Sequence, residues 1–155
     1  HSDTWEDDGS RIDHGTMFYQ AAKTGIVDPA RSIQIGMRTH HEDTHGYQVL
    51  DARWLHRHGV DRAVEAIKAR VGASACYLTF DIDFLDPAFA PGTGTPVVGG
   101  FDTHTALEII RGMAGIRIVG ADVVEVSPPY DHAETTALAA ASIAHEMLCL
   151  MNFRN

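Results

Sequence analysis

The stretch ACYLTFDIDFLDPAFAPGTGTP (75–96) begins as an apolar run, reaches two acids and continues into a long loop rich in Pro and Gly. The run over 75–83 predicts a β-strand that is apolar on both faces, which is typical of a parallel sheet. Parallel α/β sheets bind their ligands at the carboxyl ends of the strands. The two acids and the loop therefore mark the place where a functional site is expected.

The same pattern continues on both sides of this stretch. We expect further strands over 32–36, 47–50 and 116–126, and helices over 17–25, 60–71, 104–114 and 132–152. Asp51 is expected to cap a short helix before residue 60, and Asp102 or Thr103 to cap the helix over 104–114. Strands that alternate with helices predict an α/β fold, with a mainly parallel sheet covered by helices on both faces.

Composition narrows the class of protein. The 155 residues suffice for one domain, and 12 Lys plus Arg against 21 Asp plus Glu give a formal net charge of −9. This acidic balance argues against nucleic acid as a partner and fits a small cationic substrate or a metal ion. Because no apolar run is long enough to span a membrane, we expect no membrane contact. Cys76 and Cys149 lie in apolar runs and are predicted to be buried free thiols, as in the reducing cytoplasm.

Asp81 and Asp83 carry the strongest chemical signal. They stand two residues apart at the end of a predicted strand, so their side chains are expected to point the same way. Two carboxylates aimed at one spot repel each other unless a positive charge lies between them, and a hard divalent cation is the usual partner. From these residues alone another interpretation stays open, in which one acid caps the next turn and the other faces solvent.

Three weaker signals accompany these acids. His1 and Asp3 have the same spacing and join an imidazole to a carboxylate. His14 precedes a Gly in a polar loop and is a candidate general acid or base, or else an ordinary solvated side chain. Glu125 ends the apolar run over 116–126, where a carboxylate needs a partner such as a buried Arg or a cationic substrate.

The remaining histidines show no matched spacing, and we expect none of them to bind a metal ion. Those in or near polar loops are interpreted as surface residues: His40, His41, His45, His56 and His58. Those on predicted helices are interpreted as ordinary helix residues: His104 and His145.

Together these segments resemble the arginase/agmatinase (ureohydrolase) family over nearly the whole chain. The stretch over 77–96 is the most specific match, and further segments match in the same order: DHGTMF (13–18), SIQIGMR (32–38), VVEVSPPYD (123–131) and TALAAASIAHEML (136–148). HSDT (1–4) looks like the last part of the family motif Asp-Ala-His-x-Asp. We therefore expect residues 1–155 to be the C-terminal part of a single ureohydrolase domain, cut at its N-terminal edge within a metal-binding motif.

The resemblance implies a three-layer α/β/α fold, a pair of Mn²⁺ ions bridged by carboxylates and a hydroxide, and homo-oligomers, often trimers or hexamers. By motif position, the family's metal ligands in this chain are His1, Asp3, Asp81 and Asp83. Two further ligands of the family would precede the chain. His14 matches the family's candidate acid/base histidine, and Glu125 matches the acid that pairs with the guanidinium group of the substrate.

Within the family, DHGTMFYQAAKTG (13–25) looks more like agmatinases than arginases, which implies hydrolysis of agmatine to putrescine and urea. The loop between Asp3 and His14 is acidic, which suits a substrate with an amine tail unless these acids face solvent. The acids are Glu6, Asp7, Asp8 and Asp13. One departure from agmatinases is Phe101-Asp102, which stands where Leu-Thr is usual. If that segment shapes the pocket, the alternative of another guanidino substrate, such as guanidinobutyrate, stays open. A non-catalytic member of the fold is the alternative from another class of protein.

Overall fold

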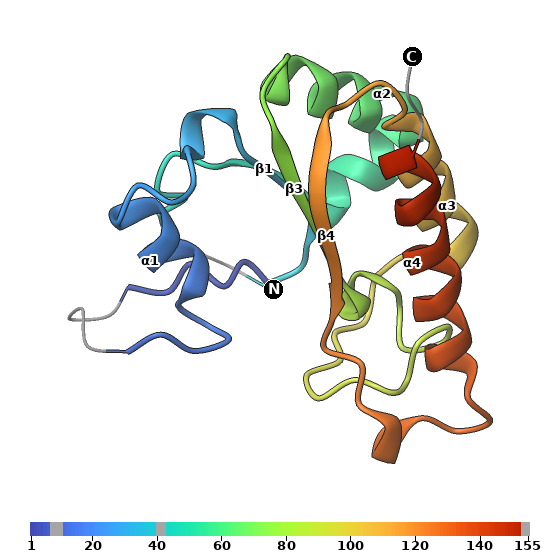
Figure 1. Cartoon of the computed structure of the whole chain (residues 1–155). Helices are drawn as coiled ribbons and strands as arrows, with labels where there is room; N and C mark the ends of the chain where they lie inside the picture. The colour runs from blue at the N-terminus through green and yellow to red at the C-terminus, as the bar shows by residue number, and fades with distance from the viewer. Residues whose placement is uncertain (7–10, 40–42, 153–155) are drawn as a thin grey trace.

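The computed structural model describes residues 1–6, 11–39 and 43–152, with strands that stand beside a group of helices (Figure 1). The strands are β1 (Ile33–Met37), β2 (Gln48–Asp51), β3 (Cys76–Asp81) and β4 (Ile118–Val124). The helices are α1 (Met17–Lys23), α2 (Ala52–Val71), α3 (Thr103–Gly112) and α4 (Thr135–Asn152). The α/β class predicted from the sequence is confirmed.

Parallel pairing brings the functional segments to one edge. β1 pairs with β2 and β3 pairs with β4, both in parallel, as two separate two-stranded sheets in the described part of the chain. At the end of the second pair, Asp81 on β3 lies opposite Val124 on β4. Because both strands end there, Asp83 and Glu125 leave the sheet at the same edge. The parallel arrangement predicted from the apolar runs is confirmed.

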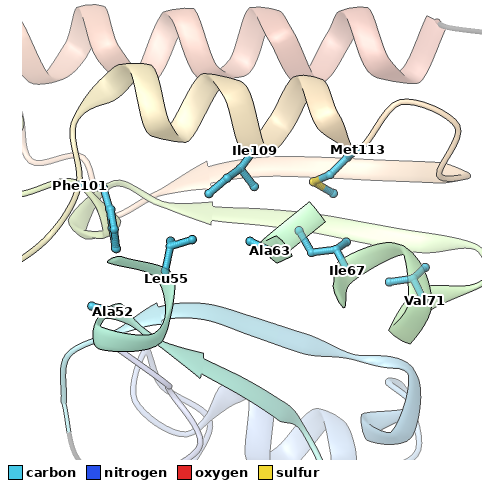
Figure 2. Close-up of a cluster of buried hydrophobic side chains, with 8 residues drawn as sticks. All are labelled: Ala52, Leu55, Ala63, Ile67, Val71, Phe101, Ile109 and Met113. Atoms are coloured by element: carbon cyan, nitrogen blue, oxygen red, sulfur yellow. The ribbon is translucent and has the colours of Figure 1, made fainter. Parts of the chain in front are cut away.

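Two clusters of buried side chains hold the helices on the strands. Figure 2 shows the first, in which side chains of α2 face Ile109 of α3 and Met113 just after it, with Phe101 at one end of the row. Its members are Ala52, Leu55, Ala63, Ile67, Val71, Phe101, Ile109 and Met113. The second joins α3 and α4 to β3 and β4, with Ile110 and Ile143 at most 2% exposed. Burial of this apolar surface is the main stabilising contribution, and it fixes the strand ends that carry the site.

Helix α2 unites two helices that the sequence predicts separately. Asp51 caps its first turn as expected, because its Oδ1 accepts a hydrogen bond of 2.7 Å from the backbone N–H of Trp54. The second half covers the predicted helix over 60–71. Between the halves, Gly59 has φ 77° and ψ 179°, a conformation that interrupts the helix. That region is reached almost only by glycine, so the kink depends on this residue.

We expect Gly59→Ala to lower the free energy of unfolding by about 1–3 kcal/mol, because a Cβ strains this backbone conformation. A Cβ at Gly59 would meet no atom within 4 Å, so the loss would come from the backbone alone. Urea denaturation measures this loss, provided that the slope of the unfolding free energy against urea concentration is the same in variant and wild type. Gly94→Ala is the matched control, because Gly94 also has open space around it but no positive φ. Equal stability of the two variants would contradict the assignment of strain to Gly59.

Some predictions about single residues fail and others hold. Both cysteines are free thiols, but Cys149 is exposed on the outer side of α4, so its predicted burial is wrong, and Cys76 is half-buried. The apolar run that suggested burial spans the helix, whereas only one stripe of a helix faces the core. Several predictions concern residues outside the described ones: His40, His41, Asp7 and Asp8. Among the helices described, none has the length and apolar character needed to cross a membrane.

Candidate metal centre

Asp81 and Asp83 take different positions at the end of β3. Asp81 is the last residue of the strand, and its Oδ1 accepts a hydrogen bond of 2.9 Å from the backbone N–H of Asp83. Asp83 lies in the 3-10 turn Ile82–Phe84 that follows. One half of the alternative interpretation therefore holds, because Asp81 does cap the next turn. The other half is wrong, because Asp83 is only 3% exposed and does not face solvent.

The carboxylate of Asp83 is buried without full compensation. Its Oδ2 is buried and accepts no hydrogen bond from any residue that the structure describes. A buried carboxylate oxygen without a partner costs several times more than a satisfied one. A cation bound at this oxygen would remove that cost.

His1 is oriented as a metal-ligating imidazole requires. Its Nε2 lies 3.1 Å from the backbone carbonyl of Thr95, in the loop that follows the Asp81–Asp83 segment. When Nε2 donates to this carbonyl, the proton is on Nε2 and the lone pair is on Nδ1. Histidines that bind metals commonly donate their second ring N–H to a carbonyl in this way. The contact thus leaves Nδ1 as the available ligand atom.

Backbone contacts hold the segment that carries Asp3. The carbonyl of Asp3 accepts a hydrogen bond of 3.0 Å from Phe18 N–H at the start of α1. The amide of Gln34 on β1 donates to the carbonyl of Ser2 at 2.7 Å. Asp3 itself has φ 51°, in the left-handed region that non-glycine residues rarely adopt. Such strain persists only where surrounding contacts enforce it, and it is concentrated at functional sites.

The charges around these carboxylates leave a deficit of positive charge. Burial raises the pKa of Asp3 to about 6, and the nearby charges of Asp83 and Glu125 add to the rise, while the α-amino group opposes it. Burial, followed by the charge of Asp83, raises the pKa of Asp81 to about 7. Carboxyl groups that repel one another in a buried place favour a divalent cation between them.

His14 and Glu125 reach the same edge from other elements. His14 is exposed in the loop before α1, where the side chain of Asp13 accepts a hydrogen bond of 3.0 Å from Gly15 N–H. Glu125 directly follows β4 and has φ 64°, again in the left-handed region. The charges of both residues act on Asp3. The structure therefore brings the six residues that the sequence singled out to one edge, and all of them come from loops, turns or strand ends.

The donor set fits divalent metal ions. Three carboxylates and one imidazole are ligands that Mn²⁺ and related ions accept. The orphaned Oδ2 of Asp83 and the preset Nδ1 of His1 are the observations that favour a metal. In the described ranges, the four residues do not yield three ligand atoms within 4.8 Å of one another. That spread is wide for one ion, whereas two ions about 3.5–4 Å apart span more space.

Among the described residues, three ligand atoms do lie within 4.8 Å of one another at Glu6, Asp43 and His45. The Nδ1 atom of His45 lies 3.9 Å from a carboxylate oxygen of Glu6 and 3.8 Å from one of Asp43. The side chain of His45 is 11% exposed, so its prediction as a surface residue is wrong. The spacing Asp43-x-His45 repeats that of His1-x-Asp3 and would have been the signal. The predictions for His56 and His58 as exposed residues hold, although both lie on α2.

Comparison with known proteins identifies the family of the chain. The model of the arginase family matches residues 1–149. The agmatinase of Chromobacterium violaceum is 55% identical over 152 residues, which make up 97% of this chain and 47% of that protein. The crystal structure of a hypothetical agmatinase from Burkholderia thailandensis matches with a TM-score of 0.94 and 56% identity, over 97% of this chain and 48% of that one.

A proclavaminate amidino hydrolase from Streptomyces clavuligerus has the same fold, with a TM-score of 0.93 and 40% identity over 97% of this chain and 52% of that one. The chain thus spans about half the length of the relatives it matches. The arginase-like fold expected from the motifs is confirmed by these structures. Given the match over residues 1–149, the chain belongs to the arginase family.

Proposed function

We propose that the protein is a metal-dependent ureohydrolase that hydrolyses agmatine to putrescine and urea. The observation that carries the proposal is the buried Oδ2 of Asp83, which has no hydrogen-bond partner within the described ranges and lies among the carboxylates of Asp3 and Asp81. It marks a place for a cation at the strand edge to which Glu125 and His14 also belong. Relatives named agmatinase at 55% and 56% identity support agmatine as the substrate.

The proposed cofactor is a pair of Mn²⁺ ions. His1 through Nδ1, together with the carboxylates of Asp3, Asp81 and Asp83, would hold them. Two bound divalent ions lower the pKa of water and so supply hydroxide at neutral pH for attack on the guanidinium carbon. In this chain, the carbonyl of Thr95 keeps the His1 ring in the tautomer that such binding needs.

Glu125 and His14 are proposed to handle the substrate. The carboxylate of Glu125 accepts paired hydrogen bonds from the planar guanidinium group, which orients the carbon to be attacked. His14, exposed at the edge of the site, gives a proton to the leaving amine, so that the amine departs as a stable product. The bond broken is the C–N bond between the guanidino carbon and this amine.

The structure gives Phe101-Asp102 a structural explanation. Phe101 is 5% exposed and stacks on Phe84, with ring centroids 4.9 Å apart. Asp102 caps α3, because its Oδ1 accepts a hydrogen bond of 2.7 Å from Thr105 N–H. Both residues therefore serve the core and the helix start, and neither supports a different substrate. The acidic loop is also a weaker argument than the sequence suggested, because Asp13 forms an ion pair with Arg11.

Urea release tests the proposal. We expect full-length protein loaded with Mn²⁺ to release urea from agmatine far faster than from arginine or guanidinobutyrate, and to lose this activity after chelation. Release mainly from guanidinobutyrate would keep the reaction and replace the substrate. A protein that binds no Mn²⁺ and releases no urea would indicate a non-catalytic member of the fold. Assembly as a homo-oligomer, a trimer or hexamer in the cytoplasm, stays a prediction.

A further inference from the structure

Arg38 follows β1 directly and reaches across to the segments that carry the site. Its Nη1 donates to the backbone carbonyls of Gly36 and Phe84, each at 3.2 Å. Its Nη2 donates to the carbonyl of Val97 at 2.9 Å and to that of Asp83. The guanidinium group is half-buried, and these acceptors are all neutral carbonyls.

The acceptors belong to the two places that orient metal ligands. One is the carbonyl of Asp83 itself, whose side chain lies in the turn after β3. Another is the carbonyl of Val97, two residues beyond Thr95, which meets Nε2 of His1. One cation on β1 thus ties the Asp83 turn to the loop that positions His1. These segments are 45 to 59 residues away from Arg38 in sequence.

An arginine suits this task better than other residues. Its guanidinium group is a rigid planar fork with five N–H donors, so it can satisfy several carbonyls in fixed directions. Hydrogen bonds from a charged donor are also stronger than neutral ones. Lys has three donors on one nitrogen and therefore satisfies only part of this set. The loop after Asp83 has a second anchor in Asp86, which accepts from Gly99 N–H at 2.8 Å.

We propose that Arg38 is a positioning residue for the metal centre, which fixes Asp83 and, through the loop at 95–97, His1. The inference rests on the proposed function, because it concerns the affinity for Mn²⁺. Residues that orient metal ligands typically contribute about 10- to 100-fold to metal affinity. The site therefore depends on β1, which supplies no ligand of its own.

Mn²⁺ titration of the full-length protein tests the role. We expect Arg38→Met to raise the Kd for Mn²⁺ by about 10- to 100-fold, and Arg38→Lys to restore part of the affinity. The electron paramagnetic resonance signal of the bound Mn²⁺ should change in Arg38→Met. The kcat of Arg38→Met should be closer to that of wild type at saturating Mn²⁺ than at limiting Mn²⁺. Arg38→Lys keeps a charge and donors in place if Arg38→Met does not fold.

Arg70 provides the matched control. It also donates to backbone carbonyls, those of Ser32, Pro29 and Gly46, at 3.1, 2.8 and 2.6 Å, but near the start of β1. Arg70→Met should lower thermal stability and leave the Kd for Mn²⁺ unchanged. If Arg38→Met has the Mn²⁺ affinity and the resonance signal of wild type, the role of Arg38 is overturned and the proposed function stands. The same holds if Arg38→Met and Arg70→Met lose affinity equally. A wild-type protein without Mn²⁺ affinity would overturn the proposed function and the inference with it.

Discussion

Asp83→Asn is expected to abolish tight Mn²⁺ binding and to slow urea release from agmatine by about a thousandfold, which corresponds to about 4 kcal/mol. The reason is that Asp83 supplies a buried carboxylate with one oxygen free of any hydrogen bond in the described part of the chain. An amide there offers a single weak oxygen ligand and no negative charge. Calorimetric titration with Mn²⁺ and a urea assay on the full-length protein measure both effects.

The same change should leave the metal-free fold intact. Removing one of several carboxylates that repel one another eases their repulsion, so thermal stability without metal should not fall. Asp122→Asn is the matched control. Asp122, on the neighbouring strand β4, also has a buried carboxylate oxygen, Oδ1, without a hydrogen bond among the described residues. Its Oδ2 accepts a hydrogen bond of 2.9 Å from the Tyr77 hydroxyl, and it has no counterpart among the proposed ligands. Wild-type Mn²⁺ affinity in Asp83→Asn would contradict the assignment of this carboxylate as a ligand.

Glu125→Gln is expected to reduce kcat/KM for agmatine by about a hundredfold while Mn²⁺ binding stays close to that of wild type. A hydrogen bond to a charged group contributes about 1.5–3 kcal/mol, and the guanidinium cation loses its charged partner. Glutamine has nearly the same shape as glutamate, so the left-handed backbone conformation at φ 64° strains both proteins to the same extent. Steady-state kinetics and metal titration on one preparation separate substrate binding from metal binding.

Glu134→Gln provides the comparison for Glu125. Glu134 is an exposed acid with φ 57°, so the substitution changes the same chemical group in a similar backbone conformation, at a residue with no proposed role in the site. This variant should keep wild-type kinetics. If Glu125→Gln instead loses Mn²⁺ and keeps its activity per bound metal, then Glu125 is a metal-site residue and not the partner of the guanidinium group.

The elements of the fold were largely predictable from the sequence because they depend on local pattern. The apolar run that ends at Asp81 predicts a buried parallel strand, and Asp51 and Asp102 predict helix starts. The kink at Gly59 is also a local feature, because it falls between the short helix expected after Asp51 and the helix expected over 60–71. Exposure within a helix is less predictable, and Cys149 shows why: an all-apolar segment does not reveal which stripe faces the core.

The positions of the site residues were predictable in part. The motif order suggests which residues meet, but strand alternation misplaces Asp83, which lies in a 3-10 turn and not on the strand. The contact of His1 with the carbonyl of Thr95 joins residues 94 apart and leaves no trace in local sequence. The same holds for Arg38, whose acceptors are backbone carbonyls and therefore independent of residue type. Long-range contacts to the backbone need the structure.

Anomalous scattering at the manganese edge, from crystals of the full-length protein loaded with Mn²⁺, tests the central claim most directly. The account predicts two neighbouring Mn²⁺ peaks, with His1, Asp3, Asp81 and Asp83 among their ligands. No peak at these residues would contradict it, as would Mn²⁺ bound only by the group of Glu6, Asp43 and His45.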